Sequence, residues 1–237
     1  MLSISELERK IREMNKTKID WADYSINPVT GRCKGGCWYC YSNRMYDRFK
    51  WNPEIEYHVE RLDDIAKLKK PSRIFIGSTH DLFGDWIPQA WIDSILFNCS
   101  NPQHTFFFLT KNPLRYSGFR LASNQWAGVT HTGEPTKGYI TNGQLYSEIT
   151  ISWEHQKHRF LSCEPLLGDA VDIPSGCEWI IIGAMTGHGK QYRPKLEWIE
   201  SIVERARARD ISIFMKSNLK DAYPHKLIQE FPKGVPT

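Results

Sequence analysis

The chain has 237 residues, of which 41% are hydrophobic and 24% are charged, and its formal net charge is +4 at pH 7. This length supports one substantial core, and the composition is ordinary for a globular protein, which argues against a disordered or fibrous chain. No apolar run approaches the roughly 18 residues that indicate a membrane span, and the N-terminus does not resemble a secretory signal. We therefore expect a single-domain cytoplasmic protein over residues 1–237, whose mild basicity permits a nucleic-acid partner without requiring one.

The first predicted element is a helix at the N-terminus, within residues 1–16. Ile4, Leu7 and Ile11 recur there at helical spacing. Apolar runs rich in β-forming residues then predict about seven strands, around residues 19–26, 73–78, 105–110, 126–130, 159–163, 179–184 and 211–216. Because the later runs are continuously apolar, we expect strands that are buried on both faces.

Helical patterns lie between several of these runs. Residues 87–98 and 195–209 are the clearest, whereas residues 131–150 indicate a loop or insertion. Strands that alternate with helices predict a parallel sheet with helical crossovers. The number of strands favours an α/β fold of the partial or complete (β/α) TIM-type barrel class, with a doubly wound open sheet as the alternative.

Three of the six cysteines crowd into one loop after the first predicted strand. Cys33, Cys37 and Cys40 have the spacing C-x3-C-x2-C, with Gly35 and Gly36 between the first two. The glycines let the backbone curl so that three thiolates can converge on one group. In a reducing compartment such crowding favours a metal or an iron-sulfur cluster over disulfides. Three thiolates would leave one iron of a four-iron cluster open.

A structural zinc site is the alternative reading of the same loop. Zinc in such sites takes four ligands, commonly from two cysteine pairs or from cysteines with histidines. The chain has no second cysteine pair, so His58 or His80 would have to supply the fourth ligand. The protein would then be a non-enzymatic module that binds nucleic acid or protein.

The cysteine loop resembles the hallmark loop of the radical SAM superfamily, which has this spacing and an aromatic residue beside the last cysteine. Tyr39 and Tyr41 flank Cys40 here. The resemblance implies a [4Fe-4S] cluster on the three cysteines, S-adenosyl-L-methionine at the open iron, and an external electron donor. It also implies reductive cleavage of the sulfonium to a 5'-deoxyadenosyl radical, which is chemistry that the cofactors supply.

A closer resemblance covers about residues 17–220. The stretches K-I-D-W-A-D-Y-S-I-N-P-V-T-G, K-K-P-S-R-I-F-I-G-S-T-H-D-L-F, H-T-F-F-F-L-T-K-N-P and R-F-L-S-C-E-P-L-L-G are similar to a phage-associated, radical SAM-like family of unassigned function. That family commonly has Gly-Gly-Glu-Ser-Gly where this chain has G-A-M-T-G at 183–187. Because this carboxylate is missing, a further alternative is a barrel that keeps its cluster but has lost its cofactor site.

Polar residues that follow the apolar runs are the candidate site residues, because parallel barrels work at the carboxyl ends of their strands. The superfamily resemblance implies that Ser78, Thr79 and Asp81, after the second barrel strand, lie near the cofactor's amino group; a helix cap is the alternative. Glu164 follows a later strand, where it could bond a ribose hydroxyl or form a salt bridge. Lys111 and Lys216 also end strands. Both lysines could bind a carboxylate or a phosphate. The predicted cofactor site consists of Tyr39, Ser78, Thr79, Asp81 and Glu164.

Aromatic residues near the expected mouth alternate with basic ones, as in W-Y-C-Y and R-M-Y-D-R-F-K-W. Stacking platforms beside cations suit a nucleobase or a single strand, so a nucleic acid or nucleotide is the first candidate substrate. The alternative is that these rings only pack the barrel. A large substrate would have to meet the open side of the barrel, where a protein partner could complete the site.

Overall fold

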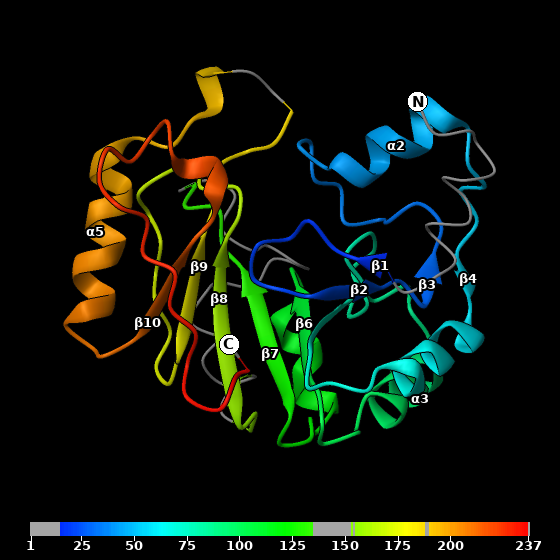
Figure 1. Cartoon of the computed structure of the whole chain (residues 1–237). Helices are drawn as coiled ribbons and strands as arrows, with labels where there is room; N and C mark the ends of the chain where they lie inside the picture. The colour runs from blue at the N-terminus through cyan, green and yellow to red at the C-terminus, as the bar shows by residue number, and fades with distance from the viewer. Residues whose placement is uncertain (1–14, 135–152, 154, 188–189, 237) are drawn as a thin grey trace.

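A computed structural model of the chain describes residues 15–134, 153, 155–187 and 190–236. One sheet dominates it, with the strand order β1-β2-β5-β6-β7-β8-β9-β10 (Figure 1). Every neighbouring pair from β2 to β10 is parallel, and only the short edge strand β1 is antiparallel. The strands are β1 (Asn15–Lys16), β2 (Tyr24–Ile26), β5 (Arg73–Ile76), β6 (Thr105–Thr110), β7 (Gln125–Thr130), β8 (His158–Cys163), β9 (Trp179–Ile182) and β10 (Ser212–Met215).

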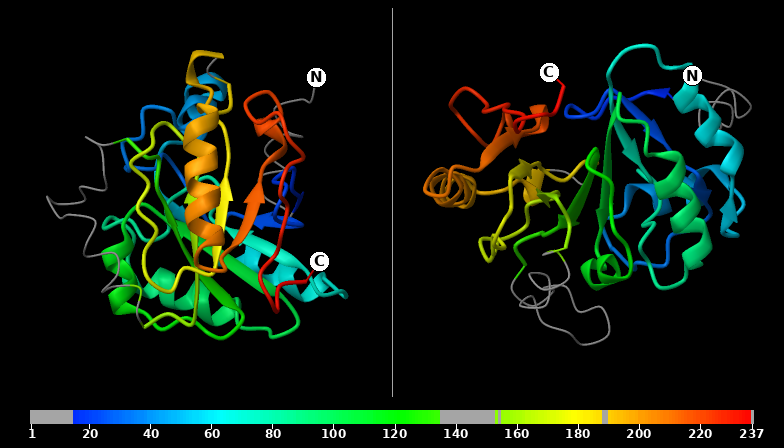
Figure 2. Two further views of the ribbon diagram at one scale, coloured as in Figure 1. Left: turned by 90° about the vertical axis from the view of Figure 1, so that its left-hand side faces the viewer. Right: turned by 90° about the horizontal axis from the view of Figure 1, so that it is seen from below.

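The parallel strands curl into a partial TIM-type barrel, visible when the molecule is viewed from below (Figure 2). All of the predicted strands are present and they follow one another in sequence order around the curl. A doubly wound sheet would instead reverse its strand order at a switch point. The predicted barrel class is therefore confirmed in its partial form.

Both faces of the sheet are buried, which explains the continuous apolar runs. On β6, Phe106 and Phe108 belong to the outer core that the helices cover, whereas Phe107 points into the curl. Successive side chains of a strand alternate between faces, so each run must be apolar throughout. The inner face is filled by aromatic rings, with Trp21 and Trp179 at 6.0 Å in an edge-to-face contact.

Two helices on the outer face lie where the sequence predicts them. Helix α3 (Gln89–Asn98) buries Ile92 and Ile95, and helix α5 (Leu196–Arg207) buries Ile199 and Ile202. Short 3₁₀ helices occupy several connections: η1 (Val59–Lys67), η2 (Pro113–Gly118), η3 (Lys190–Tyr192) and η4 (Ser217–Leu219). No helix in the described ranges is both long enough and apolar enough to cross a bilayer.

Helix α2 (Tyr41–Phe49) is not among the predicted elements. It buries only Ser42 and Tyr46, so its sequence lacks the apolar stripe that marks the other helices. It begins at Cys40, whose Sγ accepts a hydrogen bond from the amide of Asn43 at 3.4 Å. The last cysteine of the loop therefore caps the helix that follows it.

The C-terminal segment closes part of the open side of the barrel. Phe231 packs on Trp179 and Phe214 of the inner aromatic cluster, with ring centroids 5.6 and 5.2 Å apart. The guanidinium of Arg73, from strand β5 across the curl, lies 4.2 Å from the Phe231 ring centroid. The segment therefore links the last barrel strand to the second.

Two sequence predictions fall on the edges of the described structure. Residues 15 and 16, the end of the predicted N-terminal helix, instead form β1, where they pair with Tyr24 and Ser25 of β2. Residues 1–14 lie outside the described residues. Of the predicted loop or insertion at 131–150, residues 131–134 carry neither helix nor strand, and 135–150 are outside the described part.

Candidate active site

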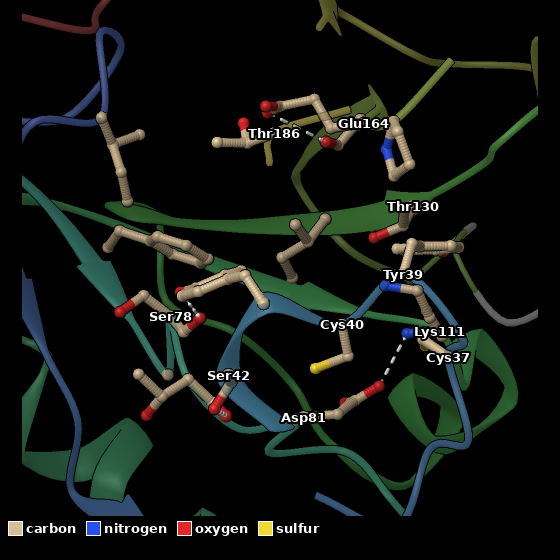
Figure 3. Close-up of a pocket in the computed structure, with 18 of the residues that line it drawn as sticks. Cys37, Tyr39, Cys40, Ser42, Ser78, Asp81, Lys111, Thr130, Glu164 and Thr186 are labelled. Carbon is tan, nitrogen blue, oxygen red and sulfur yellow. Dashed lines mark hydrogen bonds between the residues drawn. The ribbon is translucent and has the colours of Figure 1, made fainter. Parts of the chain in front are cut away.

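A cavity of about 580 Å³ lies at the carboxyl ends of the parallel strands. Figure 3 shows Cys37, Cys40 and Asp81 on one side of it, with Glu164 and Thr186 across from them. The cavity is within the size range of small-molecule and cofactor sites. All of the predicted site residues line it, namely Cys33, Cys37, Tyr39, Cys40, Ser78, Thr79, Asp81 and Glu164, and so do Lys111 and Lys216.

The cysteine loop and helix α2 lie between two short strands that pair with each other outside the main sheet. Strand β3 (Val29–Thr30) leads into the loop and pairs with β4 (Glu56–Tyr57), to which the chain returns after α2. Gly31 begins the loop with φ +92°, and a Cβ there would lie 2.2 Å from the carbonyl oxygen of Glu54. Only glycine fits such a backbone at so close an approach.

All three loop cysteines are free thiols, and all three are partly exposed to the cavity. Burial raises the pKa of Cys33 to about 11 and also raises that of Cys37, which the nearby Lys111 partly offsets. The described residues contain no group of three His, Cys, Asp or Glu side chains already gathered around a common metal position. The donor set nevertheless fits an iron-sulfur cluster with one open iron: three thiols on one loop, facing one cavity.

The histidines that the zinc alternative requires are engaged elsewhere. His58 Nε2 lies 2.8 Å from Thr30 Oγ1, and its Nδ1 lies 3.3 Å from the Glu60 carboxylate. His80 uses both ring nitrogens, one toward the Gly31 carbonyl and the other toward the Trp86 indole. Neither ring has a nitrogen left to bind a metal in this arrangement.

The turn after β5 is tied to helix α2 through backbone carbonyls. Tyr41 Oη donates to the carbonyl of Ser78 at 2.5 Å, and Ser42 Oγ donates to that of Thr79 at 2.9 Å. Asn27, after β2, accepts from the Thr79 amide at 3.0 Å and from Ser78 Oγ at 3.1 Å. Asn27 is a residue that the sequence reasoning missed, although it too is a polar residue directly after a strand.

Asp81 joins the ends of β5 and β6. Its carboxylate accepts hydrogen bonds from Thr110 Oγ1 at 2.7 Å, the Lys111 amide at 2.8 Å and the Phe83 amide at 3.1 Å. These three donors hold the carboxylate in place, and the bond from the Phe83 amide closes a turn. No helix begins at this turn, since α3 starts only at Gln89, so the alternative of a helix cap is not formed. The Lys111 ammonium lies 5.7 Å from the Tyr39 ring centroid, a cation–π contact at the cavity wall.

Glu164 forms the salt bridge that was one of its two predicted roles. Lys216 Nζ lies 2.5 Å from Oε1, while the Trp21 indole donates to Oε2 at 3.3 Å. Both charged side chains remain part of the cavity wall. The ion pair and a contact to a ligand hydroxyl are therefore compatible in this geometry.

Thr130, which ends β7, adds an unsatisfied polar atom to the cavity. Its residue is 1% exposed, and its Oγ1 has no hydrogen-bond partner. A buried hydroxyl without a partner is costly unless something else bonds it. The Thr130 hydroxyl is therefore suited to bond a polar ligand in the cavity.

The family profile described as "Protein of unknown function (DUF5131)" matches residues 16–222. The chain belongs to this family. A comparison of the DUF5131 chain with curated proteins finds no match.

Among solved structures, the DUF5131 chain is similar to several of spore photoproduct lyase. A double mutant with bound AdoMet and dinucleoside spore photoproduct superposes with a TM-score of 0.52 at 14% identity over 92% of this chain. The lyase complexed with dinucleoside spore photoproduct gives 0.50 at 14% over 82%, and a single mutant gives 0.50 at 15% over 93%. This chain spans 65%, 63% and 65% of those chains, respectively. At such identity the likeness supports the barrel fold.

Proposed function

We propose that this protein is a radical SAM enzyme carried by one barrel domain, with a [4Fe-4S] cluster on Cys33, Cys37 and Cys40. The observation that carries the proposal is that the three free thiols of a C-x3-C-x2-C loop face one cavity at the carboxyl ends of a partial barrel. When bound, the cluster with S-adenosyl-L-methionine at its open iron supplies reductive cleavage to a 5'-deoxyadenosyl radical.

The surrounding residues would bind and orient the S-adenosyl-L-methionine. Asn27 and helix α2 hold the turn at Ser78 and Thr79 beside the cysteine loop, where the turn forms part of the cavity wall. Glu164 and the unsatisfied hydroxyl of Thr130 face the same cavity from later strands and would bond polar groups of the nucleoside half. Apolar residues of the wall, among them Trp21, Phe75 and Leu109, would exclude water from the reacting groups.

The proposed substrate class is a nucleic acid or nucleotide. Trp38 and Tyr41, on the cysteine loop and at the start of α2, are 42% and 46% exposed, which is unusual for large rings. Arg44 lies on the same helix, and net charge is positive. Support also comes from the structural neighbours that hold a dinucleoside, and from the phage association that the sequence resemblance implies.

The experiment is a cleavage assay under anaerobic conditions. The reconstituted protein is mixed with S-adenosyl-L-methionine and a reductant, and 5'-deoxyadenosine is measured with and without single-stranded DNA, duplex DNA or RNA. Formation of 5'-deoxyadenosine by the wild type and its loss in Cys37→Ala support the proposal. A protein that retains iron but forms none would instead be a barrel that has lost its cofactor chemistry.

A further inference from the structure

The start of the cysteine loop is held by two buried hydrogen bonds on one residue. The amide of Gly31 donates to Tyr46 Oη at 2.7 Å, and the Gly31 carbonyl lies 3.1 Å from His80 Nδ1. Gly31 is two residues from Cys33 and cannot shift toward β4, because the Glu54 carbonyl is already in close approach. The position of the first cysteine therefore depends in part on these two partners, beside the Arg32 amide, which donates to the Pro53 carbonyl at 2.8 Å.

The second nitrogen of His80 defines its tautomer. Trp86 Nε1 lies 2.8 Å from His80 Nε2. An indole N–H can only donate, so Nε2 must accept and cannot carry a proton. The proton of the neutral ring is then on Nδ1, where it donates to the Gly31 carbonyl. His80 is 3% exposed, and burial lowers its pKa, which agrees with a neutral ring.

The segment that carries His80 is itself fixed on both sides. Before it, the Thr79 carbonyl accepts from Ser42; after it, the Asp81 carboxylate binds the end of β6. The Trp86 ring also lies beneath the loop, since a Cβ at Gly35 would be 3.8 Å from it. His80 therefore connects the loop to a strand end that is hydrogen-bonded on both sides.

We propose that His80, held by Trp86 as the Nδ1–H tautomer, is the positioning residue that fixes the cysteine loop against the turn after β5. The inference rests on the proposed function, because it assigns the loop to cluster binding. It concerns the arrangement of the protein before any cluster is bound, and it can therefore be tested on the protein without iron.

The first test is the tautomer itself. ¹⁵N–¹H correlation of the histidine rings in the iron-free protein at neutral pH should show His80 with its proton on Nδ1. In Trp86→Phe, which removes the indole donor, the ring should lose this strict preference. A proton on Nε2 in the wild type would overturn the proposal, whether or not the protein binds iron.

The second test uses His80→Asn and His80→Gln, each of which keeps one of the two hydrogen bonds of His80. Asn places an amide N–H near the Nδ1 position, where it can donate to the Gly31 carbonyl, whereas Gln places an amide oxygen near the Nε2 position, where it can accept from Trp86. Thiol labelling of the iron-free protein is followed by mass spectrometry, with the buried cysteines Cys99, Cys163 and Cys177 as internal references. Labelling of Cys33 should stay within about twofold of wild type in His80→Asn and rise roughly tenfold in His80→Gln, the equivalent of about 1.4 kcal/mol.

Iron uptake provides the link to function. His80→Gln should retain less iron than His80→Asn after reconstitution, while the control His104→Gln should match wild type. His104 is also buried, but it packs against Phe106 on β6, and its ring nitrogens have no hydrogen-bond partner. Equal labelling in the two His80 variants would overturn the positioning role. A wild type that takes up no iron would instead contradict the proposed function and leave the tautomer and labelling results standing. If either variant fails to fold, the wild-type tautomer decides.

Discussion

The ammonium of Lys216 lies 2.5 Å from the carboxylate of Glu164, and this contact joins the ends of β10 and β8 across β9. Both side chains are about four-fifths buried, with 20% and 18% exposure. The pair therefore lies between an exposed salt bridge, which contributes little, and a fully buried one, which is costly to break.

Replacing Lys216 by Met should lower the free energy of unfolding by about 2 kcal/mol at neutral pH, because Glu164 loses its partner. Burial lowers the pKa of Lys216, but Glu164 outweighs it and raises the pKa above the ordinary 10.5. The stabilisation is thus fully present below pH 10.5 and is lost as the pH rises through the higher folded value. Urea titrations at several pH values measure this difference.

Lys195→Met is the matched control, since its pairing with Glu197 is long, at 3.7 Å, and mostly exposed. We expect little change in stability from it at any pH. An equal loss of unfolding free energy in both variants would show that the pair of Lys216 with Glu164 stabilises the protein no more than an exposed pair does.

Thr130→Val should stabilise the ligand-free protein and weaken the binding of its ligand. Valine has nearly the same shape and removes a buried hydroxyl that has no partner, so unfolding should cost about 1 kcal/mol more. Binding of S-adenosyl-L-methionine, measured by calorimetry on the reconstituted protein, should weaken roughly tenfold.

The comparison is Thr110→Val at the end of β6. Its hydroxyl donates to Asp81 and accepts from the Asn112 amide, so its removal should cost about 2 kcal/mol of stability. A stability loss in Thr130→Val as large as that in Thr110→Val would mean that Thr130 already has a partner within the protein.

Much of the fold was predictable because most of the barrel strands contain a continuous apolar run. The runs at 105–110 and 179–184 needed no knowledge of their neighbours to indicate buried strands. Helix α2 could not be predicted in this way, since it is held by Tyr41, Ser42 and Tyr46 through hydrogen bonds to distant segments. The predicted site residues share one cavity because all lie on the cysteine loop or at strand ends. Asn27, by contrast, is distinguished by hydrogen-bond partners that only the fold reveals. Thr130 ends a predicted strand, but only the fold shows that its hydroxyl has no partner.

Gly128→Ala should destabilise the barrel. A Cβ at this position of β7 would lie 2.2 Å from the Phe160 ring of β8, in the buried sheet. Overpacking of this kind costs about 1–3 kcal/mol, which thermal unfolding can measure. Gly118→Ala, where a Cβ meets nothing within 4 Å, should stay within about 0.5 kcal/mol of wild type. A tolerated Gly128→Ala would show that Phe160 can move within the aromatic cluster.

Arg44 connects helix α2 to the segment after β9. Its guanidinium donates to the carbonyls of Thr186 and Gly187 at 3.1 and 3.0 Å. Arg44→Met should therefore increase hydrogen exchange at residues 184–187 with only a small change in overall stability. Arg48→Met is the control, because that side chain lies over Phe49 on the same helix. Equal exchange in the two variants would contradict a tethering role for Arg44.

Metal analysis after anaerobic reconstitution shows whether the cysteine loop holds the proposed iron-sulfur cluster. Iron, sulfide and zinc are measured in the wild type, in Cys37→Ala and in the control Cys99→Ala, whose thiol is buried away from the cavity. We expect about four irons per chain in the wild type and in Cys99→Ala, with loss of iron and sulfide in Cys37→Ala. Stoichiometric zinc without iron, bound by the wild type and lost in Cys37→Ala, would show that the loop is a zinc site and not a cluster site.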